Sequence, residues 1–133
     1  MTQSIPEEML AALARTANAL DYKAHMALIS PGVNVFGVPG FEVIGYDDWA
    51  RQCAHEFAHK LLKRVHFEGL QIVSSTGNHI LFKTVETAEG TDGTINHHGL
   101  EILIQKESDG VWRVTQERIL PPEEVAFDRH KSR

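Results

Sequence analysis

Two histidines and one glutamate in the stretch AHEFAHKLL, residues 54–62, have a spacing that could support catalysis. His55, Glu56 and His59 spell H-E-x-x-H. On a helix this spacing puts the two histidines one turn apart, where they can bind zinc, and it makes the glutamate available as a general base. The same five-residue pattern is typical of zinc metalloproteases.

Two observations argue against a zinc site. A helical projection at about 100° per residue puts His55 and His59 on the side opposite the apolar residues, so they face solvent. A third ligand is also missing, because Leu62 and Val65 stand where the extended pattern needs a glycine and a histidine. We therefore predict no metal here and no zinc metalloprotease.

Glu101 and Glu117 form a better candidate site. Ser108-Asp109-Gly110 is typical of a three-residue hairpin loop that ends with a left-handed glycine. Such a loop pairs residue 107 with 111 and, further along, 101 with 117. The two carboxylates would then lie directly opposite each other, which destabilises a sheet and raises one of the two pKa values. A pair of this kind is better tolerated where it binds a ligand or moves a proton.

The same face of the sheet would supply the rest of a pocket. His97 lies further along the strand of Glu101, and we predict that Glu101, Glu117 and His97 are the catalytic residues. Neighbouring strands and the second helix would add the ligand-binding residues, which are His25, Phe82, Thr84, Glu86, Leu103, Thr115 and Ile119.

Three alternatives stay open for these residues. A two-residue loop would move Glu117 to the other face of the sheet and dissolve the pair. Either Glu101 or Glu117 could form an ion pair with an arginine instead. His25 could be a hydrogen-bonded core residue rather than part of a pocket.

The opposite face of the last two strands is too apolar to be exposed to water. We therefore expect a second subunit to cover it in a homodimer. The residues expected at this interface are Leu100, Ile102, Ile104, Trp112 and Val114.

Helices come first in the chain and strands follow. Ser4-Ile5-Pro6-Glu7 is a capping box that opens the first helix. A short second helix and a third helix are predicted over residues 21–30 and 47–62, with a strand at 33–38 between them. Alternating residues and short Gly-containing loops then predict an antiparallel meander with strands at 63–75, 79–89, 94–107 and 111–120.

This order predicts a single α+β domain over residues 1–122, with helices on one face of a curved sheet. A charged tail follows at residues 123–133, and we expect it to be mobile.

The composition is that of a globular domain, with 42% hydrophobic and 23% charged residues. A net charge of −5 gives no reason to expect nucleic acid or an anionic membrane as a partner. The single cysteine, Cys53, rules out an internal disulfide. The N-terminus has no secretion signal, and no apolar run approaches the roughly 18 residues of a membrane span. We therefore expect a cytoplasmic protein.

The stretches DYKAHMALISPGVNVFGVPG (21–40) and KESDGVWRVTQERI (106–119), with the order of the elements, resemble the nuclear transport factor 2-like superfamily. This superfamily includes SnoaL-like polyketide cyclases, ketosteroid isomerase, scytalone dehydratase and the association domain of calcium/calmodulin-dependent kinases. The resemblance extends from about Pro6 to Leu120. It implies a cone-shaped, cystatin-like roll, in which three helices pack in the concave face of a curved, mostly antiparallel sheet around a deep pocket. It also implies a dimer through the outer sheet face.

The resemblance does not imply the mechanism of the known steroid isomerases. Their catalytic aspartate would fall at Phe36 or Gly37, and their tyrosine has no match near Leu10. Glu101 lies on the strand that carries their acid-donating aspartate. The kinase association domain has arginines at positions that resemble Thr84, Leu103 and Ile119, so the implied pocket here is acidic and apolar.

The leading hypothesis is a small-molecule-binding domain. If it is an enzyme, the chemistry would be isomerisation, dehydration or cyclisation by proton transfer, without a cofactor. The alternative is a non-catalytic module for ligand sensing or assembly, because one fold serves several functions. A third interpretation makes His97, Glu101 and Glu117 the ligands of a divalent ion.

Overall fold

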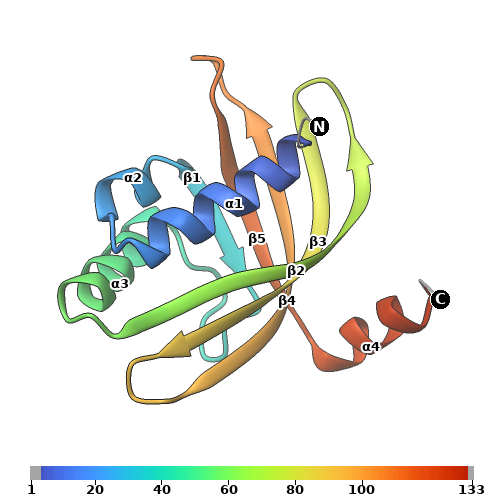
Figure 1. Cartoon of the computed structure of the whole chain (residues 1–133). Coiled ribbons are helices and arrows are strands. Elements are labelled where there is room, and N and C mark those ends of the chain that lie inside the picture. Colours follow the sequence, from blue (N-terminus) through green and yellow to red (C-terminus); the bar gives the residue numbers. More distant parts are fainter. Residues whose placement is uncertain (1–3, 132–133) are drawn as a thin grey trace.

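The structure is a computed structural model that describes residues 4–131, and it has an α+β architecture, as predicted (Figure 1). The elements in chain order are α1 (Ile5–Asn18), α2 (Tyr22–Met26), β1 (Ile29–Phe36), α3 (Tyr46–Ala58), β2 (Leu62–Ser75), β3 (His79–Gly90), β4 (Ile95–Lys106), β5 (Trp112–Leu120) and α4 (Pro122–Lys131). The sheet order is β1-β5-β4-β3-β2, with β1 parallel to β5 and all other neighbours antiparallel. Within residues 4–131, no helix combines the length and the apolar character that crossing a membrane requires.

Helices α1, α2 and α3 lie on the concave side of the curved sheet, and α4 lies outside it (Figure 1). The predicted capping box opens α1, because the Glu7 backbone N–H donates to the Ser4 side chain and the Ser4 N–H donates to the Glu7 carboxylate. One face of α1 then buries Met9, Leu10 and Leu13 in the core. The predicted arrangement of three helices inside a curved, mostly antiparallel sheet is confirmed.

The four strands of the meander begin and end within one residue of the predicted positions. The helices are shorter than predicted. α3 ends at Ala58 rather than at residue 62, because Lys60 adopts a left-handed conformation with φ of 52°. α2 ends at Met26, and β1 starts at Ile29 rather than at residue 33, because Ile29 already pairs with Val114 of β5.

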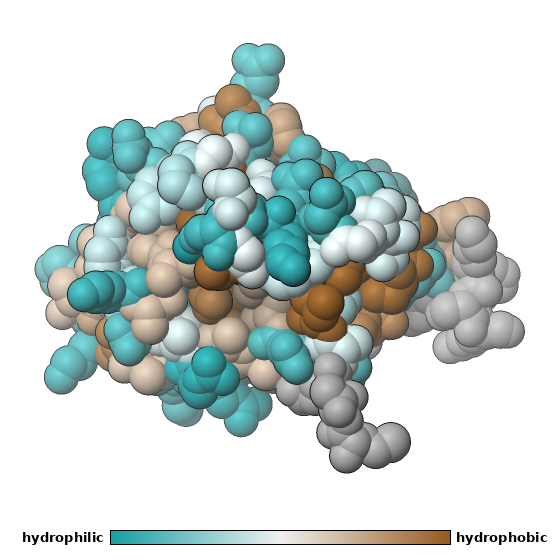
Figure 2. All heavy atoms as spheres, turned by 90° about the horizontal axis from the view of Figure 1, so that it is seen from above, coloured by the Kyte–Doolittle hydropathy of each residue, from teal (hydrophilic) through white to brown (hydrophobic). Residues whose placement is uncertain are grey.

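The apolar face of β4 and β5 packs against the chain's own helices. Leu100, Ile102, Ile104 and Val114 are at most 2% exposed and belong to the main core, and Trp112 packs against that core. The prediction that these five residues form a subunit interface is therefore wrong. The homodimer itself stays a prediction, but these residues cannot form its interface. The exposed apolar side chains of the sheet include Leu70, Ile72 and Val73 on β2 instead. From above, hydrophobic surface gathers between the two ends of the chain (Figure 2).

The hairpin between β4 and β5 has the predicted loop but not the predicted register throughout. Glu107 N–H donates to Val111 O, and Gly110 has φ of 82°, as a three-residue loop with a left-handed glycine requires. A β-bulge then follows, because Ile104 pairs with Val114 but Leu103 pairs with Gln116, which leaves Thr115 as an extra residue in β5. Every residue of β5 after the bulge therefore faces the side opposite to the one predicted.

Residues 123–131 of the predicted tail belong to helix α4, which begins at Pro122 and is attached to the outer face of the sheet. Residues 132–133 of the tail lie outside the described residues. Arg118 of β5 binds Glu101 of β4 and Glu124 of α4 with N–O distances of 3.1 and 2.8 Å. Lys83 of β3 binds Asp128 and Glu124 of α4 at 2.9 and 3.1 Å. Two acidic residues of the predicted tail, Glu124 and Asp128, are therefore ion-paired with the sheet.

Gly37, directly after β1, positions the loop that leads to α3. Its φ is 87°, and a Cβ atom there would lie 2.5 Å from the backbone oxygen of Ile119 in β5. Gly40 in the same loop has almost the same φ, 86°, but a Cβ there would meet no atom within 4 Å. The two glycines therefore share one backbone conformation and differ in how closely β5 approaches them.

We expect Gly37→Ala to lower the free energy of unfolding by about 3 kcal/mol, because the left-handed conformation costs roughly 1–2 kcal/mol and the overlap with Ile119 adds to it. Gly40→Ala is the matched control and should cost only about 1 kcal/mol. Urea unfolding followed by circular dichroism measures both values. Equal losses in the two variants would show that the loop does not press against β5.

Candidate functional site

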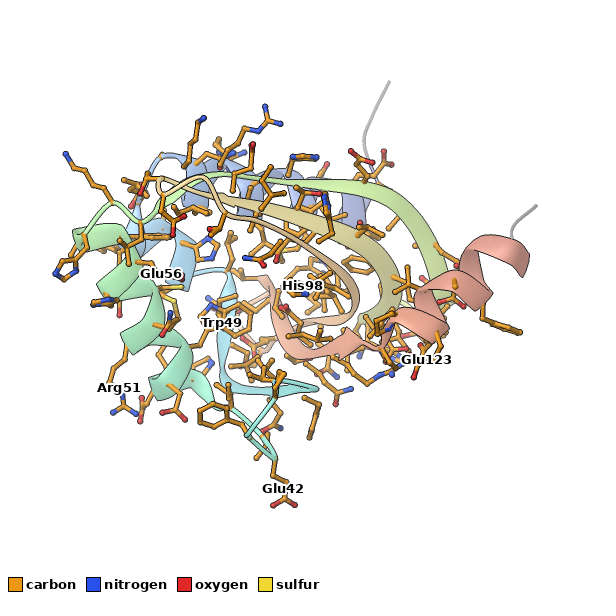
Figure 3. The ribbon with its side chains drawn as sticks, turned by 90° about the horizontal axis from the view of Figure 1, so that it is seen from below. Glu42, Trp49, Arg51, Glu56, His98 and Glu123 are labelled. Carbon is orange, nitrogen blue, oxygen red and sulfur yellow. The ribbon has the colours of Figure 1, made fainter. Side chains whose placement is uncertain are left out.

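A cleft of about 560 Å³ opens between α3 on one side and β1, β5 and the loop after β1 on the other. Five of its lining residues are apolar or aromatic, namely Val35, Val38, Phe41, Ile44 and Trp49. In the view from below, Trp49 projects from α3 toward the sheet, and His98 of β4 lies on the same side of the sheet (Figure 3). A ligand in this cleft would therefore have most of its surface against apolar side chains.

Glu117 lies deep in this cleft. The bulge at Thr115 puts its side chain on the concave side of β5, where it pairs with Ile102 of the core. Every fully buried side-chain nitrogen and oxygen of the described residues has a hydrogen-bond partner. The Glu117 carboxyl group has no hydrogen-bond partner among the described residues. Its oxygens are therefore not fully buried, and they are open to the cleft.

The environment of Glu117 favours its neutral form. Burial, and in second place the negative charge of Glu86, raise the pKa of Glu117 from 4.5 to about 8. The carboxyl group therefore holds its proton at neutral pH. A neutral carboxyl group facing a cleft can donate a hydrogen bond or a proton to a ligand.

Two further carboxyl groups lie near Glu117. Glu86 of β3 pairs with His98 of β4 on the concave face, and burial and the negative charge of Glu56 raise its pKa. Glu56 lines the cleft from α3. Acidic side chains from three elements, α3, β3 and β5, therefore converge on this part of the concave face.

Cys53 lines the same cleft, one turn before Glu56 on α3. Burial, followed by the charge of Glu56, raises the pKa of its thiol to about 11. The thiol therefore stays protonated near neutral pH and lacks the thiolate form that nucleophilic catalysis requires.

Arg51, the one arginine among the described lining residues, does not neutralise these carboxyl groups. Arg51 is on the exposed side of α3 and forms an ion pair with Asp48, one turn earlier on the same helix. This pair lies at the rim, and its two charges compensate each other.

A second hollow, of about 510 Å³, lies on the outer side of the sheet between β2, β3 and α4. Its charged lining residues include Lys83 and Asp128, which form an ion pair with each other. Because Lys83 and Asp128 bind each other, their charges are not available to a ligand in this hollow. We therefore place the candidate site in the cleft of Glu117.

The H-E-x-x-H residues do not form a metal site in the structure. His55 and His59 are exposed, and His59 already lies beyond the end of α3. Glu56 turns toward the cleft instead of toward the two histidines. Among residues 4–128, whose side chains the structure describes, no group of three or more potential ligands could hold a metal ion.

The predicted Glu101–Glu117 pair is wrong. Glu101 lies on the outer face and binds Arg118 through two hydrogen bonds of 3.2 and 3.1 Å. His97 is also on the outer face, where its Nδ1 lies 2.9 Å from the hydroxyl oxygen of Thr87. Because Glu117 faces the concave side, these three residues cannot act on one ligand or bind one metal ion. The reason is the Thr115 bulge, and not the shorter loop that was the alternative.

Two of the predicted ligand-binding residues are part of the core. Phe82 is fully buried. His25 is buried with its Nδ1 2.8 Å from the Thr16 hydroxyl oxygen and its ring packed edge-on against Phe57. Burial lowers the pKa of His25, so the ring stays neutral as a hydrogen-bonded core residue.

The other predicted ligand-binding residues have mixed positions. Thr84 is buried and its hydroxyl group donates to the backbone oxygens of Glu68 and Gly69 in β2. Leu103 lies on the outer face, and Thr115 donates to its backbone oxygen. Ile119 packs against the core on the concave side. Among the predicted site residues, the structure brings only Glu86 and Glu117 together near the cleft.

Sequence reasoning missed Trp49, Glu56 and His98. Trp49, Cys53 and Glu56 follow the spacing i, i+4, i+7, which puts three side chains on one face of a helix. This spacing, with a glutamate at the end of an otherwise apolar face, was the signal that could have found Glu56.

No model of a protein family and no curated protein matches the sequence. A candidate scytalone dehydratase from Novosphingobium aromaticivorans is similar in structure, with a TM-score of 0.70 and 14% identity over 86% of this chain and 79% of that chain. A candidate ketosteroid isomerase from Shewanella frigidimarina gives 0.68 and 16% over 89% and 96%. A candidate dehydratase of the nuclear transport factor 2-like family from Streptomyces avermitilis gives 0.65 and 17% over 87% and 92%. The chain therefore has the α+β fold of the nuclear transport factor 2-like proteins, as its sequence resemblance implied.

Proposed function

We propose that this protein binds a compact, partly apolar organic molecule in the cleft beside α3 and exchanges a proton with it through Glu117. The observation that carries the proposal is a carboxyl group without a partner, deep in an apolar cleft, with a pKa raised to about 8. Strongly shifted pKa values in clefts are typical of groups that work as acids or bases.

Glu117 can serve as both acid and base in one reaction. Its protonated form gives its proton to the carbonyl oxygen of the ligand. The resulting carboxylate then takes a proton from the carbon next to the carbonyl group, which leaves the enol and restores the protonated Glu117. The raised pKa suits this task, because a group with a pKa near the working pH both gives and accepts protons readily. Isomerisation and dehydration of a carbonyl compound need a transfer of this kind and no cofactor.

The structural neighbours support the same reaction classes. Those three proteins are described as candidate dehydratases and a candidate ketosteroid isomerase. Their identity to this chain is low, so they support the class of ligand site rather than a substrate. The apolar lining by Val35, Val38 and Trp49 favours a compact ligand with a hydrocarbon body.

We expect the protein to catalyse hydrogen–deuterium exchange next to the carbonyl group in a panel of compact ketones with neutral, ammonium or carboxylate substituents. Proton NMR in D₂O measures the loss of the α-proton signal. Glu117→Gln should lower the rate at least about 100-fold, because general acid–base catalysis typically contributes two to four powers of ten.

The matched control for this experiment is Glu101→Gln, which removes a carboxylate from the outer face of the same sheet. It should keep the wild-type exchange rate, because Glu101 binds Arg118 and does not reach the cleft. Equal losses in both variants would contradict the role of Glu117. Binding of a ketone in the cleft without exchange would instead identify a ligand-sensing module.

The pKa of Glu117 also predicts how stability changes with pH. Its pKa is about 8 in the folded protein, against 4.5 without the influence of the fold, so between these values the folded state binds the proton more tightly. The free energy of unfolding should therefore fall as pH rises from about 5 to 8. The fall is at most about 5 kcal/mol, because one pKa unit corresponds to about 1.4 kcal/mol.

Urea unfolding at several pH values between about 5 and 9 measures this dependence. Glu117→Gln should flatten the curve, and Glu42→Gln, which changes an exposed glutamate in the loop after β1, should not. A part of the slope should remain in Glu117→Gln, since burial also raises the pKa of Glu86. Parallel curves for wild type and Glu117→Gln would show that Glu117 titrates normally.

A further inference from the structure

Glu56 is a second cleft carboxyl group whose charge is not compensated. It is half-buried on α3 and lines the cleft. Among residues 4–128, whose side chains the structure describes, no lysine, arginine or histidine forms an ion pair with it, and Arg51 on the same helix is bound to Asp48. The negative charge of Glu56 acts inward, since it contributes to raising the pKa values of Glu86 and Cys53.

The other charged and titratable groups around the cleft do not supply a cation. α3 contributes the compensated pair Asp48–Arg51 and the neutral thiol of Cys53. β5 and β3 contribute further carboxyl groups, and β1 and the loop after it contribute apolar lining residues. On β4, His98 lies on the concave face beside Glu86, but it is not among the residues that line the cleft. Among the described lining residues, the charge that stays uncompensated is therefore the negative charge of Glu56.

An aromatic wall lies beside Glu56. Trp49 is seven residues earlier on α3, which is two helical turns or about 10 Å along the axis, and lines the same cleft. Phe41 lines the cleft from the loop after β1 and is 62% exposed. Indole and phenyl faces attract cations, and they also cover the apolar body of a ligand.

We infer that the ligand of this cleft carries a cationic ammonium group on a compact apolar body. Glu56 pairs with the ammonium group, the body lies against Trp49, and the far end of the ligand reaches Glu117. This inference rests on the proposed function, because it uses the same cleft and leaves the proton exchange to Glu117.

The charges in the cleft discriminate among three kinds of ligand. A carboxylate or phosphate ligand would be repelled by Glu56, and the described lining residues include no unpaired arginine or lysine that could bind it. A neutral ligand would leave the charge of Glu56 uncompensated in a half-buried position. An ammonium ion compensates that charge, and a partly buried ion pair is screened less by water and salt than an exposed one.

Three probes that share one phenyl body test this inference: benzylamine, benzyl alcohol and benzoate. Their binding at pH 7 can be followed by the NMR resonance of the Trp49 indole N–H. The resonance of Trp112, which packs against the core and does not line the cleft, is the internal reference. We expect benzylamine to bind about tenfold more tightly than benzyl alcohol, and benzoate most weakly.

Two variants assign this preference to Glu56. In Glu56→Gln the ratio of the benzylamine and benzyl alcohol affinities should fall to about twofold or less, since only the cation–π attraction remains. Glu42→Gln removes the charge of an exposed glutamate, which Figure 3 places apart from Glu56, and should keep the wild-type ratio. Glu117→Gln should also keep a preference for the amine.

Two results would overturn the inference in different ways. If benzyl alcohol binds as tightly as benzylamine, or if Glu56→Gln keeps the amine preference, the ligand class is wrong while the proposed proton exchange by Glu117 stands. If no probe shifts the Trp49 resonance, the inference fails. The proposed function fails with it only when Glu117→Gln also leaves the exchange of ketone protons unchanged.

Discussion

The extra residue that Thr115 adds to β5 determines which side chains the last strand presents on each face of the sheet. Beyond it, Glu117 and Ile119 face the helices, and Gln116 and Arg118 face outward. In a regular hairpin Arg118 would point into the core, where a charge without a partner is costly. One backbone irregularity therefore supplies both the carboxyl group in the cleft and the guanidinium group that binds α4.

Both this strand and α3 supply the side chains that define the cleft. β5 provides the carboxyl group whose charge the surroundings disfavour, and α3 provides the aromatic wall and a carboxylate that keeps partial contact with water. Holding an unpaired carboxyl group away from water costs free energy, which the apolar packing of residues such as Phe82 and Ile102 offsets. The fold thus tolerates a locally unfavourable group because the core around it is well packed.

The sequence was sufficient for the architecture and insufficient for the site. Alternating residues and glycine-containing loops defined the four strands, and Gly110 defined the last hairpin. The bulge could not be predicted, because polar residues occupy both faces of the segment from Thr115 to Arg118. Helix α4 could not be predicted either, since ion pairs with Lys83 and Arg118 from distant strands attach its charged residues to the sheet.

The attachment of α4 differs in kind from the packing of the other helices. Salt weakens ion pairs such as Arg118–Glu124 but has little effect on a buried apolar core. The C-terminal helix can therefore open as a separate cooperative unit while the sheet stays folded. Its amide protons would exchange with solvent faster at high ionic strength, whereas those of β4 would still require global unfolding. We therefore expect high ionic strength to uncover more of the outer sheet face and to leave the cleft on the other side unchanged.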